Sequence, residues 1–286
     1  MVVRIGFWAR EKHNLSRMSM AQLVQAYFTH YAVATYFGLA AASIAAAWLT
    51  LTDVSILGLA RIAAAALAAV IVYPLVWYCL HRWLLHSRFM YRRAATARLW
   101  KRIHFDHHQD PHDLGVLFGA LYTTLPTIAV IALPLGWLIG DGPAGALCAF
   151  AAGLLTTCFY EFCHSAQHLN FRPRSQMMQT MKRLHLLHHF HDEHGNHGIT
   201  SFVVDRLLGT YYANARDRAK SATAFNLGYD EAEAGRFPWV AEASADGIRV
   251  GRDGRRWHPN TPQAGADAIG ADLGYDEAGS APRKAA

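Results

Sequence analysis

Residues 143–168 read PAGALCAFAAGLLTTCFYEFCHSAQH, a long apolar run that ends in two histidines. The run Pro143–Cys163 contains one charged residue, Glu161, and a helix of this length crosses about 30 Å of hydrocarbon. Three earlier windows have a similar length and composition: Tyr31–Leu51, Ile56–Leu80 and Val116–Gly140. Their one full charge is Arg61, which lies close enough to a membrane surface to reach it. Because buried helices of soluble proteins seldom run this long without a polar stripe, the sequence predicts four membrane-spanning helices.

The basic residues lie on one side of this predicted arrangement. Neither short connection between paired windows, Thr52–Ser55 or Asp141-Gly142, contains Lys or Arg. Basic residues instead precede the first window and follow the second: Arg4, Arg10, Lys12, Arg17, Arg82, Arg88, Arg92, Arg93, Arg98, Lys101 and Arg102. Because cytoplasmic loops collect Lys and Arg, we expect two helical hairpins that enter from the cytoplasmic side, with both termini cytoplasmic. The expected location is the inner membrane in a bacterium or the endoplasmic reticulum in a eukaryote.

The composition fits this prediction and excludes other classes. Hydrophobic residues make up 52% of the chain and charged residues 17%, a more apolar composition than is usual for a water-soluble protein. The cytoplasmic basic residues explain the net charge of +6, and no aromatic basic groove or known motif indicates a nucleic-acid partner. The cysteines lie inside or at the end of apolar windows, so they predict small buried hydrophobic side chains, not a disulfide framework.

Three regions follow one another along the chain. Residues 1–30 are expected to form a cytosolic or interfacial lead-in, in which Met18–His30 is either an interfacial helix or an extension of the first spanning helix. Residues 31–215 are expected to form the membrane domain, and residues 216–286 a partly disordered cytosolic extension. Within it, Ser244–Ala286 is rich in Gly, Ala, Asp and Pro, which favours a mobile tail. The expected fold is all-α and integral to the membrane, with four transmembrane helices in two hairpins and a cytosolic histidine-rich helical cap.

Most of the 17 histidines lie in two segments, each directly after a predicted hairpin. The spacing within the two segments repeats. The first reads H-x4-H followed by H-x-x-H-H, and the second reads H-x3-H followed by H-x-x-H-H. The histidines of this repeat are His81, His86, His104, His107, His108, His164, His168, His185, His188 and His189.

On a helix, positions three or four apart share one face. The spacing therefore predicts that each H-x-x-H-H triplet forms one cluster and that His164 and His168 face together. The triplets are His104, His107, His108 and His185, His188, His189. His81 and His86 are five positions apart, which is about 140° on a straight helix. They are expected either to meet beyond a helix end or to serve different metals.

Ten histidines in matching patterns predict metal binding. A single histidine in such a place is usually a hydrogen-bonded interfacial residue. Ten neutral imidazoles packed together would each need a hydrogen-bond partner, and protonated ones would repel each other. Two metal ions with about five nitrogen ligands each resolve both problems. Structural zinc usually takes four ligands, so we expect two redox-active ions, with iron the usual choice for O₂ chemistry.

Four histidines of these segments lie outside the repeat: His112, His191, His194 and His197. We expect them to support the ligands or to lie at the surface, with direct ligation the less favoured alternative. Residues 191–194 read HDEH, which matches neither of the zinc-protease motifs H-E-x-x-H and H-x-x-E-H.

The histidine pattern resembles the fatty acid hydroxylase and sterol desaturase superfamily of membrane di-iron oxygenases, and within it the fatty acid 2-hydroxylases. Residues Tyr160–His164 are similar to that family's Y-D-x-x-H element, and His185–Phe190 to its H-L-N-H-H-F element. Further elements are matched at Gly198–Ser201, Asp205-Arg206 and Leu208–Thr210. The resemblance covers about Tyr73 to Tyr211.

The resemblance implies a non-haem di-iron membrane monooxygenase that hydroxylates a lipid acyl chain, as a fatty acid or an amide-linked acyl group, near its carboxyl end. It implies the ten repeat histidines as ligands of two iron ions, which zinc is able to replace in a purified protein, and O₂ as co-substrate. Eukaryotic members often begin with a haem-binding domain, for which residues 1–30 leave no room. We therefore expect no haem in this chain and a separate ferredoxin-like or b-type-cytochrome-like electron donor with its reductase.

Departures from the family pattern leave other outcomes open. Glu161 and Val204 stand where the family has aspartate and tryptophan, and Asp110 where a histidine often stands. A sterol, carotenoid or amino-lipid hydroxylase or desaturase of the same superfamily is the first alternative. A metal transporter or metal-binding membrane protein is an alternative of another class. Transporters place ionisable residues at the membrane midplane, whereas the centres of these four windows have none.

Overall fold

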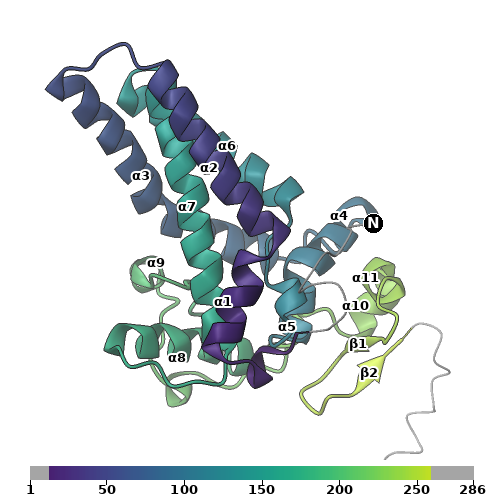
Figure 1. Ribbon diagram of the computed structural model, residues 1–286. Coiled ribbons are helices and arrows are strands. Elements are labelled where there is room, and N and C mark those ends of the chain that lie inside the picture. The colour runs from purple at the N-terminus through teal and green to yellow at the C-terminus, as the bar shows by residue number, and fades with distance from the viewer. Residues whose placement is uncertain (1–12, 259–286) are drawn as a thin grey trace, which may run out of the picture.

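Four long helices form two hairpins that lie side by side. The structure, a computed structural model, describes residues 13–258. The hairpins are α2 (Tyr31–Leu49) with α3 (Ile56–Leu80), and α6 (Leu121–Gly140) with α7 (Pro143–His168). Figure 1 shows both hairpin turns at one end of the molecule, where Arg61 Nη1 lies 3.2 Å from Asp141 Oδ2. All four helices are long and apolar enough to span a membrane, as predicted.

Three of these helices differ in extent from their predicted windows, and the first, α2, ends at Leu49, two residues before the predicted Leu51. The third window starts at Val116, whereas α6 starts at Leu121: residues 114–116 form a 3-10 turn, and the N–H of Gly119 donates to Glu161 on α7 (3.0 Å). Helix α7 continues past its predicted end to His168. The first histidine pair of the second segment therefore lies on a spanning helix.

The spanning helices are apolar on their outward faces as well as inside. Large hydrophobic side chains remain exposed on all four, among them Ile44, Trp48, Leu67, Ile71, Val130, Leu138 and Phe159. Exposed apolar area of this extent is rare in a soluble monomer. In a bilayer the same side chains face lipid, and helices satisfy their own backbone hydrogen bonds. The all-α integral-membrane fold expected from the sequence is confirmed.

The turn of the second hairpin depends on glycine. A Cβ on Gly140 would lie 2.4 Å from the Cα of Gly145, so a side chain at either position would push α6 and α7 apart. The chain then turns through Asp141, at φ 54°, and Gly142, at φ 121°. A φ of this kind favours glycine because it has no Cβ. The close approach fixes the direction of α7 and thus of the histidines at its other end.

The N-terminal segment forms a helix of its own. Helix α1 (Met20–Phe28) begins with a capping box and ends before His30, whose side chain caps α2. Of the two alternatives for Met18–His30, a helix separate from α2 is confirmed. The hydroxyl of Tyr27 donates to the carbonyl of Cys158 (2.6 Å) and ties α1 to α7.

Short elements form a cap at the end of the hairpins opposite to the turns (Figure 1). In chain order they are η2 (Leu15–Arg17), η3 (His81–Leu85), α4 (Ala94–Trp100), η4 (Lys101–Phe105), α5 (Asp106–Gln109), η5 (Leu114–Val116), α8 (Gln176–Phe190), α9 (Val203–Leu207), η6 (Ala215–Asp217), α10 (Glu231–Arg236), α11 (Trp239–Glu242), β1 (Ile248–Arg249) and β2 (Arg256–Trp257). η3 and η4 are π-helical turns, and η2, η5 and η6 are 3-10 turns.

The C-terminal segment packs into this cap. Strand β1 pairs antiparallel with β2, and Ile248 is completely buried in one hydrophobic cluster with Trp100 of α4. The predicted mobile tail, Ser244–Ala286, is therefore wrong for residues 244–258. The few apolar side chains of that segment suffice because they cover an apolar surface that the cap already provides. Residues 259–286 lie outside the described part of the chain.

Candidate metal centre

The ten repeat histidines converge in the cap, where α3 and α7 end, and form two adjacent clusters. Cluster A comprises His81, His86, His104, His108 and His188, and cluster B comprises His107, His164, His168, His185 and His189. Within cluster B the ligand atoms lie within 4.8 Å of one another, as do those of cluster A other than His104. The Nε2 atom of His104 lies 2.9 Å from that of His86. The ring centroids of His108 and His189 are 4.2 Å apart, so the two clusters are in direct contact.

A π-helical turn brings His81 and His86 together. In η3 the N–H of His86 donates to the carbonyl of His81, five residues back (3.0 Å). Because hydrogen bonds in a π-helix join residues five apart, residues with this spacing lie on one face. The two Nε2 atoms are 3.1 Å apart. The angle of about 140° applies to a straight α-helix and is wrong here, and the pair shares one cluster.

The prediction that each H-x-x-H-H triplet forms one cluster is wrong. In the first triplet, His104 and His108 contribute to cluster A and His107 contributes to cluster B. The second triplet is divided in the opposite sense, with only His188 in cluster A. The outer histidines of a triplet, four apart, share a face, while the middle one points to the neighbouring cluster. Each triplet therefore supplies both clusters.

The nitrogen positions in these clusters fit metal ions. The Nε2 atoms of His107 and His164 are 3.0 Å apart, and those of His168 and His185 are 2.8 Å apart. Two nitrogens bound at right angles, each about 2.1 Å from one ion, lie about 3.0 Å apart. His189 is 1% exposed, yet neither ring nitrogen has a hydrogen-bond partner within residues 13–258. Buried polar atoms need partners, and a metal ion supplies one, so the clusters can bind metal.

Burial keeps these imidazoles in the form that binds metal. It lowers the pKa of His108 and of His188 to about 3. Burial, with nearby histidines adding to the effect, also holds the pKa of His107 and of His189 well below the usual range. At pH 7 these rings are neutral, and a neutral imidazole offers its lone pair to a metal.

Backbone carbonyls fix three rings of cluster A. The contacts are His81 Nδ1 to His197 O (2.6 Å), His108 Nδ1 to Ala224 O (2.8 Å) and His188 Nδ1 to Gly195 O (2.8 Å). When Nδ1–H donates to a carbonyl, the tautomer is fixed and Nε2 is left to bind the metal. In cluster B, by contrast, His107, His168, His185 and His189 have no such Nδ1 partner within the described residues.

Asp205 holds the loop that carries one of these carbonyls. Its side chain is completely buried. Oδ1 accepts hydrogen bonds from the N–H of His197 (2.8 Å) and the hydroxyl of Thr210 (2.7 Å), and Oδ2 accepts from the N–H of Gly198 (2.9 Å). The sequence pattern indicated Asp205 only as part of a matched element. Its contacts with a backbone loop were not visible in any spacing.

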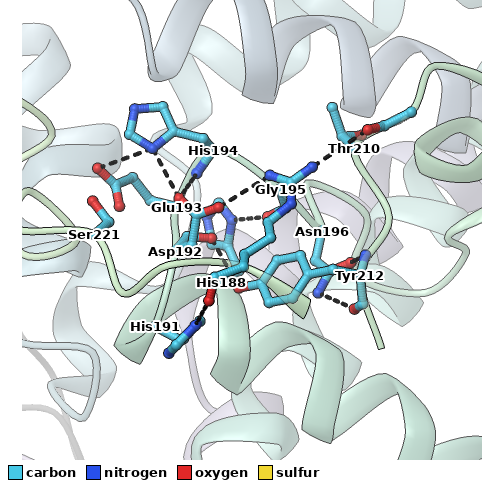
Figure 2. Close-up of polar contacts among 12 residues, drawn as sticks. His188, His191, Asp192, Glu193, His194, Gly195, Asn196, Thr210, Tyr212 and Ser221 are labelled. Atoms are coloured by element: carbon cyan, nitrogen blue, oxygen red, sulfur yellow. Dashed lines mark hydrogen bonds and ion pairs between the residues drawn. The ribbon is translucent and has the colours of Figure 1, made fainter. Parts of the chain in front are cut away.

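Figure 2 shows how the loop of residues 192–196 holds the carbonyl of Gly195 against His188. The side chain of Asn196 donates to the carbonyl of Tyr212 (2.9 Å) and accepts from its N–H (3.1 Å). The hydroxyl of Tyr212 donates to the carbonyl of Asp192 (3.0 Å). The loop is thus anchored on both sides of Gly195.

The four histidines outside the repeat lie in different surroundings. His197 is buried, with its ring centroid 5.2 to 5.5 Å from three rings of cluster A. A ring nitrogen of His112 and one of His191 lie 3.2 Å and 2.8 Å from backbone carbonyls. His194 is largely exposed. The expected supporting or surface roles of all four stay a prediction.

A third group of potential ligands is explained by protein contacts. Asp192, Glu193 and His194 bring three ligand atoms within 4.8 Å of one another. Asp192 pairs with Arg218 (3.0 Å), and Glu193 accepts a hydrogen bond from Thr223. Burial alone raises the pKa of Asp192, but hydrogen bonds from Arg218 and His194 outweigh it and hold this pKa below its ordinary value.

An apolar cavity leads to the two clusters. A cavity of about 310 Å³ lies between α3, α6, α7 and the cap, and a smaller one of about 60 Å³ reaches histidines of both clusters. Both cavities are lined by Tyr73, Trp77, Ile103, Gly119, Thr124 and Thr157, so they adjoin. Glu161 and Tyr160 lie on the wall of the smaller cavity. Within residues 13–258, Glu161 Oε2 and the Tyr160 hydroxyl have no hydrogen-bond partner.

Fold and site together define a helical membrane protein with two buried histidine clusters at the end of an apolar cavity. The family model described as "Fatty acid hydroxylase" matches residues 66–210, about half of the chain, and the chain belongs to this family. It is therefore an oxidoreductase of the lipid hydroxylase or desaturase type.

Comparison with other proteins adds a likeness in fold. The solved structure described as full-length Scs7p, with only the hydroxylase domain visible, matches with a TM-score of 0.52 at 24% identity. The match covers 66% of this chain and 68% of that chain, and at this identity it shows the fold alone. No curated protein sequence matches.

Proposed function

We propose that this protein uses O₂ to hydroxylate a lipid acyl chain near its carboxyl end, at a histidine-bound di-iron centre. The observation that carries the proposal is that the apolar cavity between the spanning helices adjoins both histidine clusters. An acyl chain can occupy this cavity while its polar end stays at the cap. The carbon nearest the clusters then lies close to the polar end.

In this proposal, clusters A and B each hold one iron ion. The chemistry that iron supplies when bound is activation of O₂ for insertion of an oxygen atom into a C–H bond. The protein contributes orientation, because the carbonyls of Gly195, His197 and Ala224 direct the rings of cluster A. It also excludes water from the site, because the cavity walls are mostly aliphatic and aromatic.

Glu161 is suited to orient the polar end of the substrate. An unpaired buried polar atom such as its Oε2 costs about 1–3 kcal/mol, and a hydrogen-bonding group of a bound lipid relieves that cost. The carboxyl group of a fatty acid and the N–H of an amide-linked acyl group both provide such a group.

The proposal includes the side of the membrane and the source of electrons. The distribution of Lys and Arg favours a cytoplasmic location for both clusters and both termini. A separate electron carrier, ferredoxin-like or b-type-cytochrome-like, with its reductase, delivers the electrons.

Lipid mass spectrometry of a host with and without the protein tests the reaction. We expect acyl chains that have gained one oxygen atom. Loss of two hydrogens instead indicates desaturation, and a modified sterol, carotenoid or amino-lipid headgroup indicates the other substrates of the superfamily. Each of these results contradicts acyl hydroxylation, as does metal uptake into vesicles without any lipid product.

One variant in each cluster tests the metal centre. We expect His107→Ala, in cluster B, and His188→Ala, in cluster A, to abolish the product and to lower iron from two ions per chain to one. Membrane insertion should be unchanged. His194→Ala is the matched control, because this histidine is largely exposed and outside both clusters. A cluster variant that keeps its activity, or an active protein that contains zinc in place of iron, contradicts the proposed centre.

A further inference from the structure

A cationic groove lies on the cap beside cluster B. It is formed by the loop before α8 and by α8 itself, has a volume of about 680 Å³, and is lined among others by Phe171, Arg172, Lys182, Arg183, Phe190 and His191. From Leu169 to His191 the chain contains four Lys and Arg residues and no Asp or Glu. Arg172, Arg174 and Arg183 are exposed.

The neighbouring segment extends this positive surface. Arg183 donates to the carbonyl of Ala213, and a ring nitrogen of His191 lies 2.8 Å from the carbonyl of Arg218, so residues 213–218 lie beside α8. Residues 213–220 carry three more cationic residues, of which Arg218 is paired with Asp192, and a single acidic one, Asp217. Asp217 accepts hydrogen bonds from backbone N–H groups at 213 and 214. The surface as a whole therefore attracts a negatively charged partner.

The groove lies one side chain away from cluster B. Phe190 lines the groove and directly follows His189 of cluster B in the chain. Its ring centroid is 6.4 Å from that of His189 and 6.0 Å from that of His112, with which it stacks. Electron transfer between proteins weakens steeply with distance. A redox group held in the groove thus has a short path to the candidate metal ligands.

The position of α8 favours a soluble partner over membrane lipid. Helix α8 lies in the cap, at the opposite end of the molecule from the turn between α2 and α3 (Figure 1). The groove is formed by α8 and the loop before it and therefore lies on the cap, outside the spanning helices, where a protein from the aqueous phase can reach it.

We propose that this groove is the docking surface for a small acidic one-electron carrier protein. The proposal rests on the hydroxylation proposed above, which needs a reductant. The balance is R–H + O₂ + 2 e⁻ + 2 H⁺ → R–OH + H₂O, so the carrier docks twice in each turnover. The carrier is oxidised each time and is reduced again by a reductase with NADPH.

The test uses the full-length, iron-loaded protein in phosphatidylcholine nanodiscs, with an acidic [2Fe–2S] ferredoxin, its reductase and NADPH as the probe. The variant is Arg172→Glu with Arg174→Glu. Both side chains are exposed, and neither makes a hydrogen bond or an ion pair within residues 13–258. The matched control is Arg98→Glu with Arg255→Glu, which changes the net charge equally at exposed positions on α4 and between β1 and β2.

We expect the groove variant to bind ferredoxin about tenfold more weakly or worse, and to raise the KM for ferredoxin by a similar factor. The control variant should keep both values within about twofold. Added salt should weaken binding to the unmodified protein more than to the groove variant. With dithionite as reductant, which needs no docking, both variants should hydroxylate at the unmodified rate.

The binding measurement separates this proposal from the proposed function. If binding falls only in the groove variant but the unmodified protein forms no hydroxylated lipid, docking stands and hydroxylation fails. Equal ferredoxin binding in all three proteins overturns the docking surface. Equal binding combined with loss of co-purifying anionic lipid from the groove variant assigns the groove to membrane headgroups, and also overturns it.

Discussion

His81 and His86 lie five positions apart in the chain, yet their Nε2 atoms are only 3.1 Å apart. The π-helical turn η3 between them accommodates one residue more than an α-helical turn does. In this turn, residues five apart lie on the same face, as residues four apart do on an α-helix. His164 and His168 of α7 are such an α-helical pair. The H-x4-H pair of the first segment and the H-x3-H pair of the second segment are therefore structurally equivalent.

This equivalence predicts the effects of changing the spacing. Deletion of Trp83, which is 57% exposed, leaves a spacing of four that an α-helix can accommodate, so two metal ions per chain should remain. Insertion of one alanine after Trp83 makes the spacing six, and one ion should be lost from cluster A. Metal analysis of the purified proteins checks both, with Trp83→Ala as the control that should keep two ions. Equal metal content in the deletion and insertion variants contradicts this account of the turn.

The spans and the histidine repeat were predictable because each depends on a local property. A long run of apolar residues is sufficient to identify a spanning helix. A shared spacing pattern predicts that ten histidines belong together, and the structure brings them together. The division into clusters A and B was not predictable, since it depends on the π-helical turn before His86 and on how helices from the two segments face each other.

The contacts that orient the histidine rings also could not be predicted from sequence patterns. The carbonyls next to His108 and His188 belong to Ala224 and Gly195, and a backbone carbonyl has no residue-type signal. Ala224 also lies beyond residue 215, where the sequence predicted the membrane domain to end. That boundary stays a prediction, but the segment after it contacts cluster A directly.

Asp205→Asn should weaken metal binding in cluster A. An asparagine keeps the shape of the Asp205 side chain, but its NH₂ group replaces one carboxylate oxygen. The NH₂ group cannot accept the hydrogen bond that this oxygen accepts from a backbone N–H. We expect the free energy of unfolding to fall by about 1–3 kcal/mol. Because Asp205 positions the residue whose carbonyl contacts His81, metal affinity should fall about 10-fold to 100-fold at one of the two sites.

Competitive titration with a chelator measures this loss. Asp253→Asn is the control, since Asp253 accepts a local backbone hydrogen bond at the surface and should change neither stability nor affinity. A uniform loss at both metal sites would show that Asp205 supports the fold in general and not cluster A.

Gln109→Ala should loosen the C-terminal segment from the cap. The amide of Gln109 donates to the carbonyls of Phe225 (2.6 Å) and Arg249 (3.1 Å) and accepts from the N–H of Arg249 (2.6 Å). Removal of these bonds should cost about 1–3 kcal/mol and increase hydrogen exchange at residues 224–250. Gln25→Ala, at an exposed position of α1, is the control. Unchanged exchange in the Gln109 variant contradicts the anchoring role.

The metal-free protein should lose stability as the pH falls below about 6.5, the ordinary pKa of histidine. Burial lowers the pKa of His108 and of His188 to about 3, so between these values the unfolded chain binds protons that the folded chain does not. Stability therefore rises with pH in this window, by about 1.4 kcal/mol per pH unit for each such histidine. Thermal unfolding of chelator-treated protein between pH 7 and pH 5 measures the slope. The double variant His108→Asn with His188→Asn should show a smaller slope, because two of the titrating groups are gone. A slope that is flat in the unmodified protein would mean that these rings are protonated in the folded state and that the clusters are open to water.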